Sequence, residues 1–110
     1  MPDSESLLED IQAQVRAKTY HYTLHAGDRM TQRHISVGDV EEAVRSDRTQ
    51  VIEDYPDDPR GPSCLILGFT EIGRPHHVQF TYPPAVAVIT AYDPDPDEWI
   101  DWRTRQGRPT

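Results

Sequence analysis

The residues best suited to chemistry lie on one predicted helix in the first third of the chain. His25, Arg29 and Arg33 follow one another at intervals of four residues, so a helix would place all three along one face. Histidine transfers protons near neutral pH, and arginine offers fixed donors to a phosphate. Together these residue types suit cleavage of an RNA phosphodiester. On spacing alone, however, an exposed helix face whose arginines pair with acidic side chains is the favoured interpretation.

The remaining histidines and the cysteine indicate no further site. His76 and His77 are adjacent in a predicted strand and would point to opposite faces, so they cannot form a two-ligand metal site. His21 would share a face with His25 only if the helix began early, and a third metal ligand is not evident. Cys64 is the only cysteine and is expected to be a small hydrophobic residue in a strand. The sequence therefore predicts neither a metal nor a cofactor.

Two helices are expected in the first third of the chain. The first, within residues 1–18, begins near Ser4 or Ser6, either of which can cap it. Its apolar stripe consists of Leu7, Leu8, Ile11 and Val15. The second, which carries the three candidate residues, is predicted from about residue 23 to residue 33. Leu24 and Met30 are expected to supply its apolar contacts.

A third helix has the clearest local signals. Ser36 as N-cap and Asp39 at the third helical position match a capping box, and Ile35 and Val40 are spaced for a hydrophobic staple. The helix is expected to end near Arg45. Its predicted buried face consists of Val37, Val40 and Val44.

The apolar period changes to two from Gln50 onward, which predicts strands. We expect them at residues 51–55, 63–70, 76–82 and 85–92, separated by segments rich in Pro, Asp and Gly. Trp99 and Trp102 are expected to anchor a short last helix against the edge of the sheet. The predicted fold class is α+β, with N-terminal helices packed on one face of a small antiparallel β-sheet of three to four strands.

Length and composition favour a single domain. The chain has 110 residues, of which 35% are hydrophobic and 27% charged. We expect a family core at residues 20–95 and a C-terminal extension at residues 96–110. No apolar run approaches the roughly 20 residues that cross a bilayer, and the N-terminus is acidic, so a cytoplasmic location and no membrane association are expected.

The charge pattern opposes nucleic-acid binding overall but not locally. The net charge of −8 would repel phosphates. Between residues 16 and 34, however, four basic residues face a single acid. The acidic residues concentrate at the N-terminus, in residues 39–58 and in residues 93–101. These acidic runs are either solvated surface or a docking site for a basic partner.

A longer pattern resembles a known family. Residues 22–43, YTLHAGDRMTQRHISVGDVEEA, resemble the signature HAxxRMxxRxIsxxDVexA of the family called domain of unknown function 4258. The later segments VIEDYP, SCLILG, GRPHHV and VITAYDP follow the strand pattern of that family in the expected order. The resemblance covers roughly residues 20–95.

This resemblance implies a fold and an activity. The family is similar to RelE-like and barnase-like ribonucleases, and its members often resemble toxins encoded beside a zinc-finger antitoxin. The implied function is a toxin-like, metal-independent endoribonuclease that cleaves mRNA, with RNA as substrate and such an antitoxin as partner. The implied site residues are His25 for proton exchange, Arg29 and Arg33 for the scissile phosphate, and Thr90 or Tyr92 to position it.

The same residues also fit two alternative interpretations. Thr90 and Tyr92 are two residues apart and would share a sheet face with Val86 and Val88, so their hydroxyls could simply close the core. The chain could also be a non-enzymatic interaction module that binds a protein through an exposed sheet edge or the acidic residues 47–58.

Overall fold

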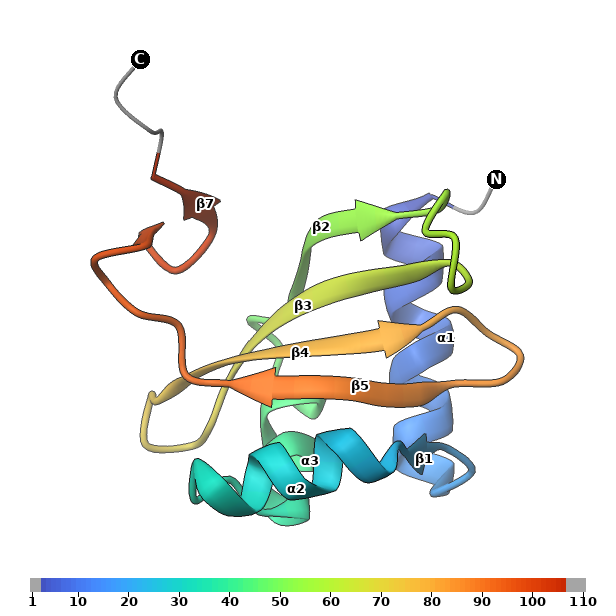
Figure 1. Cartoon of the computed structure of the whole chain (residues 1–110), viewed down its shortest axis with the longest axis horizontal. Helices are drawn as coiled ribbons and strands as arrows, with labels where there is room; N and C mark the ends of the chain where they lie inside the picture. The colour runs from blue at the N-terminus through green and yellow to red at the C-terminus, as the bar shows by residue number, and fades with distance from the viewer. Residues whose placement is uncertain (1–2, 107–110) are drawn as a thin grey trace.

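The chain forms three helices followed by the main strands of a β-sheet (Figure 1). The computed structural model describes residues 3–106. In chain order the elements are α1 (Ser4–Ala17), β1 (His21–Tyr22), α2 (Leu24–Gln32), α3 (Val37–Arg45), β2 (Gln50–Tyr55), β3 (Ser63–Phe69), β4 (Pro75–Thr81), β5 (Ala87–Tyr92), β6 (Trp99–Ile100) and β7 (Thr104–Arg105). The predicted α+β class is confirmed.

Local capping decides where α1 and α2 begin. The carboxylate of Asp3 accepts a hydrogen bond from the backbone N–H of Ser6 at 2.7 Å, so Asp3 is the N-cap of α1. The prediction of Ser4 or Ser6 as the cap is wrong, because Asp3 satisfies the free N–H one residue earlier. Thr23 caps α2 in the same way, at 3.0 Å from the third helical N–H, and Arg33 is its C-cap. The predicted extent of α2 is therefore confirmed.

The buried side of α2 is narrower than predicted. Ala26 and Met30 are buried, but Leu24 is 91% exposed. Leu24 lies about 200° around the helix from Ala26, which turns it away from the sheet. The prediction that Leu24 contributes apolar contacts is wrong.

The start of α3 is confirmed in detail. Ser36 and Asp39 form both hydrogen bonds of the capping box, at 3.0 and 2.9 Å. Val37, however, is 49% exposed, which corrects its predicted burial. It is the first residue of the helix, and the packed surface starts one turn later, at Val40, Ala43 and Val44.

The main sheet has five strands in the order β1-β5-β4-β3-β2. Four of them are antiparallel neighbours, but β1 lies parallel to β5, with His21 opposite Ala87 and Tyr22 opposite Val88. The predicted antiparallel sheet of three to four strands is thus correct for four strands and omits β1. A strand of two residues is too short to show alternation in the sequence.

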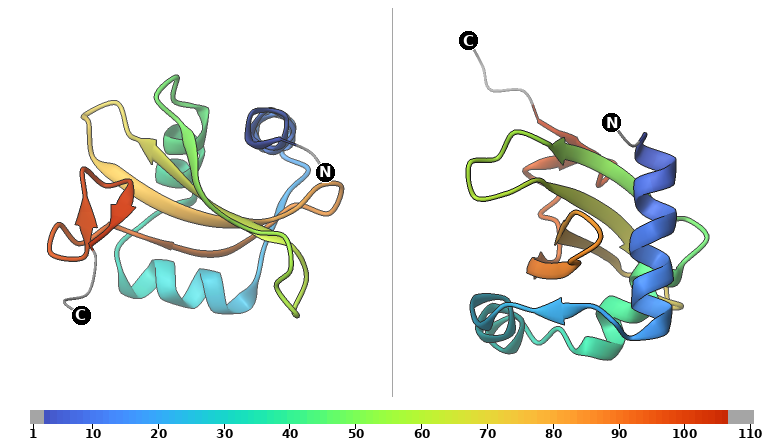
Figure 2. Two further views of the ribbon diagram at one scale, coloured as in Figure 1. Left: turned by 90° about the horizontal axis from the view of Figure 1, so that it is seen from above. Right: turned by 90° about the vertical axis from the view of Figure 1, so that its right-hand side faces the viewer.

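The helices do not all cover one face of the sheet. Figure 2 shows α1 and α3 on the same side, whereas α2 lies along the edge formed by β5 and β1. The prediction that all N-terminal helices pack on one face is wrong for α2, because β1 takes the chain to the sheet edge just before α2 begins. The core between α1, α3 and the sheet includes Ile11, Val15, Val44, Cys64, Ile66, Val78 and Phe80. Buried Cys64 confirms its predicted role as a small hydrophobic residue.

The C-terminal extension contains a hairpin in place of the predicted helix. β6 and β7 pair antiparallel, with Trp99 opposite Arg105. Asp101 and Trp102 at the turn have φ of +51° and +64°, a conformation that no right-handed helix contains. Of the extension expected at residues 96–110, residues 107–110 lie outside the described part. Across residues 3–106, no helix is both long and apolar enough to cross a membrane.

Candidate functional site

A β-bulge decides which face of the sheet carries Thr90 and Tyr92. Val88 and Thr90 pair with two successive residues of β4, so one extra residue, Ile89, is inserted between these pairs in β5. Val86 and Val88 are buried in the core, whereas Thr90 and Tyr92 are only partly buried. The prediction that these four side chains share one face is wrong, because the bulge reverses the alternation. Thr90 and Tyr92 lie on the face away from α1 and α3.

Arg33 joins the end of α2 to this face of β5. Its Nη1 donates hydrogen bonds to the hydroxyl of Thr90 at 3.2 Å and to the carbonyl of Ala91 at 2.9 Å. Its guanidinium carbon lies 5.9 Å from the ring centroid of Tyr92, within range of a cation–π contact. The structure therefore brings together three of the five predicted site residues, Arg33, Thr90 and Tyr92.

Arg33 keeps part of its hydrogen-bonding capacity free. A guanidinium has five N–H donors, and the contacts with Thr90 and Ala91 use only Nη1. Within residues 3–106, neither Nε nor Nη2 of Arg33 has a protein acceptor, and the residue is exposed. Nε and Nη2 form the planar fork that binds two oxygens of a phosphate or carboxylate. The protein thus holds one side of the guanidinium and leaves the other side for a ligand.

His77 of β4 contacts Tyr92 and so adds a histidine to the candidate site. The two residues pair across β4 and β5, and the Tyr92 hydroxyl lies 3.2 Å from Nδ1 of His77. Nε2 of His77 lies 2.6 Å from the backbone carbonyl of Trp102. Burial lowers the pKa of His77 and raises the pKa of Tyr92 to about 12, so both groups are neutral at pH 7. Sequence reasoning missed the role of His77, since its partner depends on the β4–β5 register.

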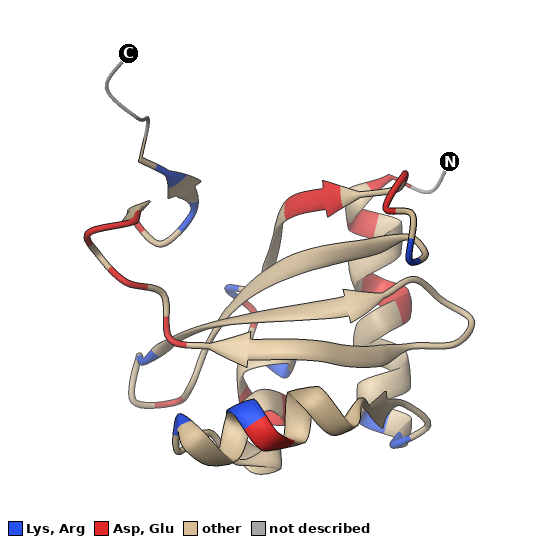
Figure 3. Ribbon diagram, in the orientation of Figure 1, with Lys and Arg blue, Asp and Glu red and all other residues tan. Residues whose placement is uncertain are grey.

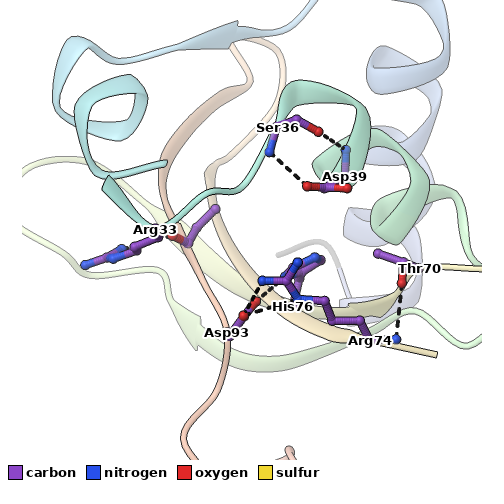
Figure 4. A network of polar contacts seen from close by, with 8 residues as sticks. Arg33, Ser36, Asp39, Thr70, Arg74, His76 and Asp93 are labelled. Carbon is purple, nitrogen blue, oxygen red and sulfur yellow. Dashed lines mark hydrogen bonds and ion pairs between the residues drawn. The ribbon is translucent and has the colours of Figure 1, made fainter. Parts of the chain in front are cut away.

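A second polar cluster fixes the ends of β4 and β5 (Figure 4). His76 is fully buried, and its Nδ1 lies 2.7 Å from a carboxylate oxygen of Asp93, although the angle departs from hydrogen-bond geometry. Arg74 pairs with the same carboxylate at 2.5 Å. Burial lowers the pKa of His76 against the opposing effect of Asp93. His76 and His77 thus point to opposite faces, as predicted, and only His77 reaches Tyr92.

The other two predicted site residues stay on the surface of α2. His25 and Arg29 are exposed, and Arg29 donates to Gln32 at 3.4 Å. Neither contacts Thr90 or Tyr92 through a hydrogen bond. His21 lies in β1, outside the helix, so the condition for a shared metal-ligand face with His25 is not met. Within residues 3–106, no three His, Cys, Asp or Glu side chains are grouped so that they could hold a metal ion.

Charge is segregated around the site (Figure 3). Acidic residues gather on β2, on the loop after it and on α1, at the far side of the sheet from α2. β3, β4 and β5 contain no Asp, Glu, Lys or Arg. α2 itself carries Arg29, with Arg33 as its C-cap, and a single acid, Asp28, whereas the neighbouring α3 carries Asp39, Glu41 and Glu42. The acidic segment 93–101 borders the end of β5, so an anionic ligand would approach along α2.

The candidate site is an open surface at the boundary between helix and sheet. Two concave regions lie elsewhere: one of about 430 Å³ lies between the end of α3 and the β3–β4 turn, and one of about 530 Å³ lies in the loop after β2. Neither is lined by Arg33, Thr90 or Tyr92. The candidate site therefore lies outside both of these concave regions.

The fold and this site define a small α+β domain with a guanidinium–hydroxyl–phenol group at its helix–sheet edge. The profile of the family described as Domain of unknown function (DUF4258) matches residues 22–93, and the chain belongs to this family. The match begins in β1 and ends just after β5, so it contains Arg33, Thr90 and Tyr92 and excludes α1 and the hairpin. No curated protein and no solved structure shows significant similarity to the chain.

Proposed function

We propose that this chain is the toxin-like component of a toxin–antitoxin pair and cleaves RNA without a metal ion. The observation that carries the proposal is the guanidinium of Arg33, which is held on one side by β5 and open on the other. A fixed guanidinium fork is a binding group for a phosphate, and it needs no reorganisation when a ligand arrives.

The neighbouring residues take roles that fit their positions. Arg33 binds the scissile phosphate, and the Thr90 hydroxyl, which accepts from Arg33, has its own proton free to donate to a phosphate oxygen. Arg29 lies one helical turn before Arg33, about 6 Å along the axis, where it can contact an adjacent phosphate. His25 lies a further turn away on the same side, about 12 Å along the axis from Arg33, so the proton exchange that we assign to it requires its side chain to extend along α2 toward the phosphate held by Arg33.

The acidic surface suits a protein partner better than it suits RNA. β2 is an edge strand, and it carries Asp54 next to Asp57 and Asp58 of the following loop, whereas Glu53 is already paired with Arg105. A basic zinc-finger antitoxin would find complementary charge there, on the side of the sheet opposite the RNA site. Substrate and partner would therefore occupy different edges of the molecule.

The test is regulated expression of the full chain in a bacterial host, with and without substitutions at the site. We expect the wild-type chain to arrest growth and fragment mRNA, and Arg33→Ala to abolish both effects. Arg33→Lys keeps the charge but not the fork, so it should also be inactive. His25→Ala and Arg29→Ala should lose growth inhibition as well, since the proposed roles of both residues require their side chains.

The matched control is Arg60→Ala, which removes an exposed arginine of the β2–β3 loop. It should remain fully toxic, and circular dichroism should show that every variant is folded. Full toxicity of both His25→Ala and Arg29→Ala would refute the roles given to these two residues. Harmless expression of the wild-type chain, together with a stable protein complex, would instead support the interaction module.

A further inference from the structure

The hairpin at the C-terminal end reaches the candidate site although it lies outside the family match. Its turn residues, Asp101 and Trp102, both have positive φ, which is an unfavourable conformation for a bulky side chain such as that of Trp102. The turn is closed by a 3.0 Å hydrogen bond from the Arg103 N–H to the Ile100 carbonyl. This backbone places the carbonyl of Trp102 2.6 Å from Nε2 of His77. Strained residues of this kind occur where a local geometry is required.

The hairpin is fixed in place by side chains. Trp99 is 3% exposed and packs edge-on against the His77 ring, with centroids 4.4 Å apart. The guanidinium of Arg105 lies over the Trp99 ring, 4.7 Å from its centroid. Arg105 also pairs with Glu53 of β2 at 2.8 Å. The hairpin is therefore held both to β2 of the sheet and to His77, the residue that its turn contacts.

The contact with Trp102 determines which nitrogen of His77 carries the proton. A carbonyl oxygen only accepts hydrogen bonds, so Nε2 must be the protonated nitrogen. In the neutral ring Nδ1 is then an acceptor, and the Tyr92 hydroxyl, 3.2 Å away, must donate its proton to it. With its only proton engaged, the Tyr92 oxygen can act toward a ligand only as an acceptor.

We propose that the hairpin is a positioning element of the candidate site: the Trp102 carbonyl fixes the Nε2–H tautomer of His77, which in turn fixes the Tyr92 hydroxyl as an acceptor. His77 is a positioning residue, because it acts through Tyr92. The consequence for the ligand rests on the proposed function. Next to a phosphate held by Arg33, an acceptor suits the 2′-hydroxyl of a ribose, which DNA lacks.

The first test needs no RNA and uses nitrogen-15 NMR of the imidazole rings in the full chain. In the wild type we expect His77 to be a single neutral tautomer protonated at Nε2. Trp102→Pro forbids the positive φ and should displace the carbonyl, so that His77 loses its single tautomer. Trp102→Gly removes the same side chain but allows positive φ, so it should keep the wild-type signal.

A wild-type His77 protonated at Nδ1, or present as a mixture of tautomers, would overturn the proposal. So would identical His77 signals in the Pro and Gly variants. If Trp102→Pro unfolds the chain, the wild-type tautomer and the Gly variant still decide the outcome. None of these results depends on ribonuclease activity, so the proposed function can fail while the hairpin proposal holds.

The second test measures RNA cleavage and separates positioning from general stability. If the hairpin acts through Tyr92, then Trp102→Pro and Tyr92→Phe should slow cleavage by similar factors, and the double variant should be no slower than either. If the double variant is instead slowed by the product of the two single factors, the hairpin does not act through Tyr92. Trp102→Gly should retain most of the wild-type rate.

Discussion

Arg33 shows how one side chain can belong to two elements. Arg33 is the C-cap of α2, and its side chain crosses to β5, where it contacts Thr90. The bulge in β5 places Thr90 on the face of the sheet that Arg33 reaches. Two of the donor hydrogens of Arg33 are used inside the protein, and the rest have no acceptor among residues 3–106. Within residues 3–106, His25 and Arg29 form no side-chain hydrogen bond with the sheet, and Arg29 donates only to Gln32 of the same helix.

The sequence predicted which residues could form the site, but not which side chains they would contact. The spacing of His25, Arg29 and Arg33 on one helix face was predictable, because helical periodicity is a local property. The contact between Arg33 and Thr90 spans 57 positions and depends on a bulge that no sequence signal marks. The same is true of His77, because its strand was predictable but its pairing with Tyr92 across β4 and β5 was not.

The buried histidines predict how stability depends on pH. Burial lowers the pKa of His76 and of His77 below the ordinary value of about 6.5. On acidification the unfolded chain therefore binds protons before the folded chain does, and stability is lost as the pH falls below about 6.5. Each histidine contributes a slope of at most about 1.4 kcal/mol per pH unit.

Urea unfolding at a series of pH values between 8 and 5 measures this slope. The variant His77→Phe is expected to be less stable at neutral pH but to show a shallower decline on acidification, because one of the two buried titrating groups is gone. Parallel curves for the wild type and His77→Phe would contradict this account of the buried histidines.

At the level of elements, the accuracy of prediction followed the range of the interactions. α2 and α3 were predicted nearly to the residue, because Thr23, Ser36 and Asp39 cap them through local hydrogen bonds. β1 and the β6–β7 hairpin were missed, since each has strands of only two residues that form only when a partner is present. A helix was expected around Trp99, where pairing with Arg105 makes a strand instead.

The contact between α3 and β3 depends on a single glycine. A Cβ atom at Gly68 would lie 2.1 Å from the carbonyl oxygen of Ala43, a backbone atom that cannot move aside. Gly68→Ala should therefore separate α3 from the sheet and lower the free energy of unfolding by at least about 2 kcal/mol.

The matched control is Gly27→Ala in α2, where a Cβ atom would meet nothing within 4 Å. Because alanine favours a helix interior over glycine, this variant should be more stable by about 0.5–1 kcal/mol. Chemical denaturation compares both variants with the wild type. Equal effects of the two substitutions would show that α3 does not approach β3 as closely as described.

At the scale of the whole molecule, charge is unevenly distributed. Arg29 and Arg33 lie on the α2 edge, the central strands are uncharged, and the acids lie mainly on α1, α3 and β2, in the loop after β2 and in segment 93–101. The net charge of −8 therefore does not describe the local charge at the α2 edge. The family match covers the α2 edge and the main sheet, whereas α1 and the hairpin lie outside it.

The most direct test of the central claim is to incubate the purified full chain with single-stranded RNA in the presence of EDTA and to identify the new ends. We predict cleavage without a metal ion, through attack of the 2′-hydroxyl, which leaves a cyclic phosphate on one product and a 5′-hydroxyl on the other. Arg33→Ala should slow this reaction by about 10²–10³-fold, the usual effect of removing one fixed donor. Intact RNA, cleavage only when Mg²⁺ is added, or an unchanged rate for Arg33→Ala would contradict the proposed metal-independent cleavage at Arg33.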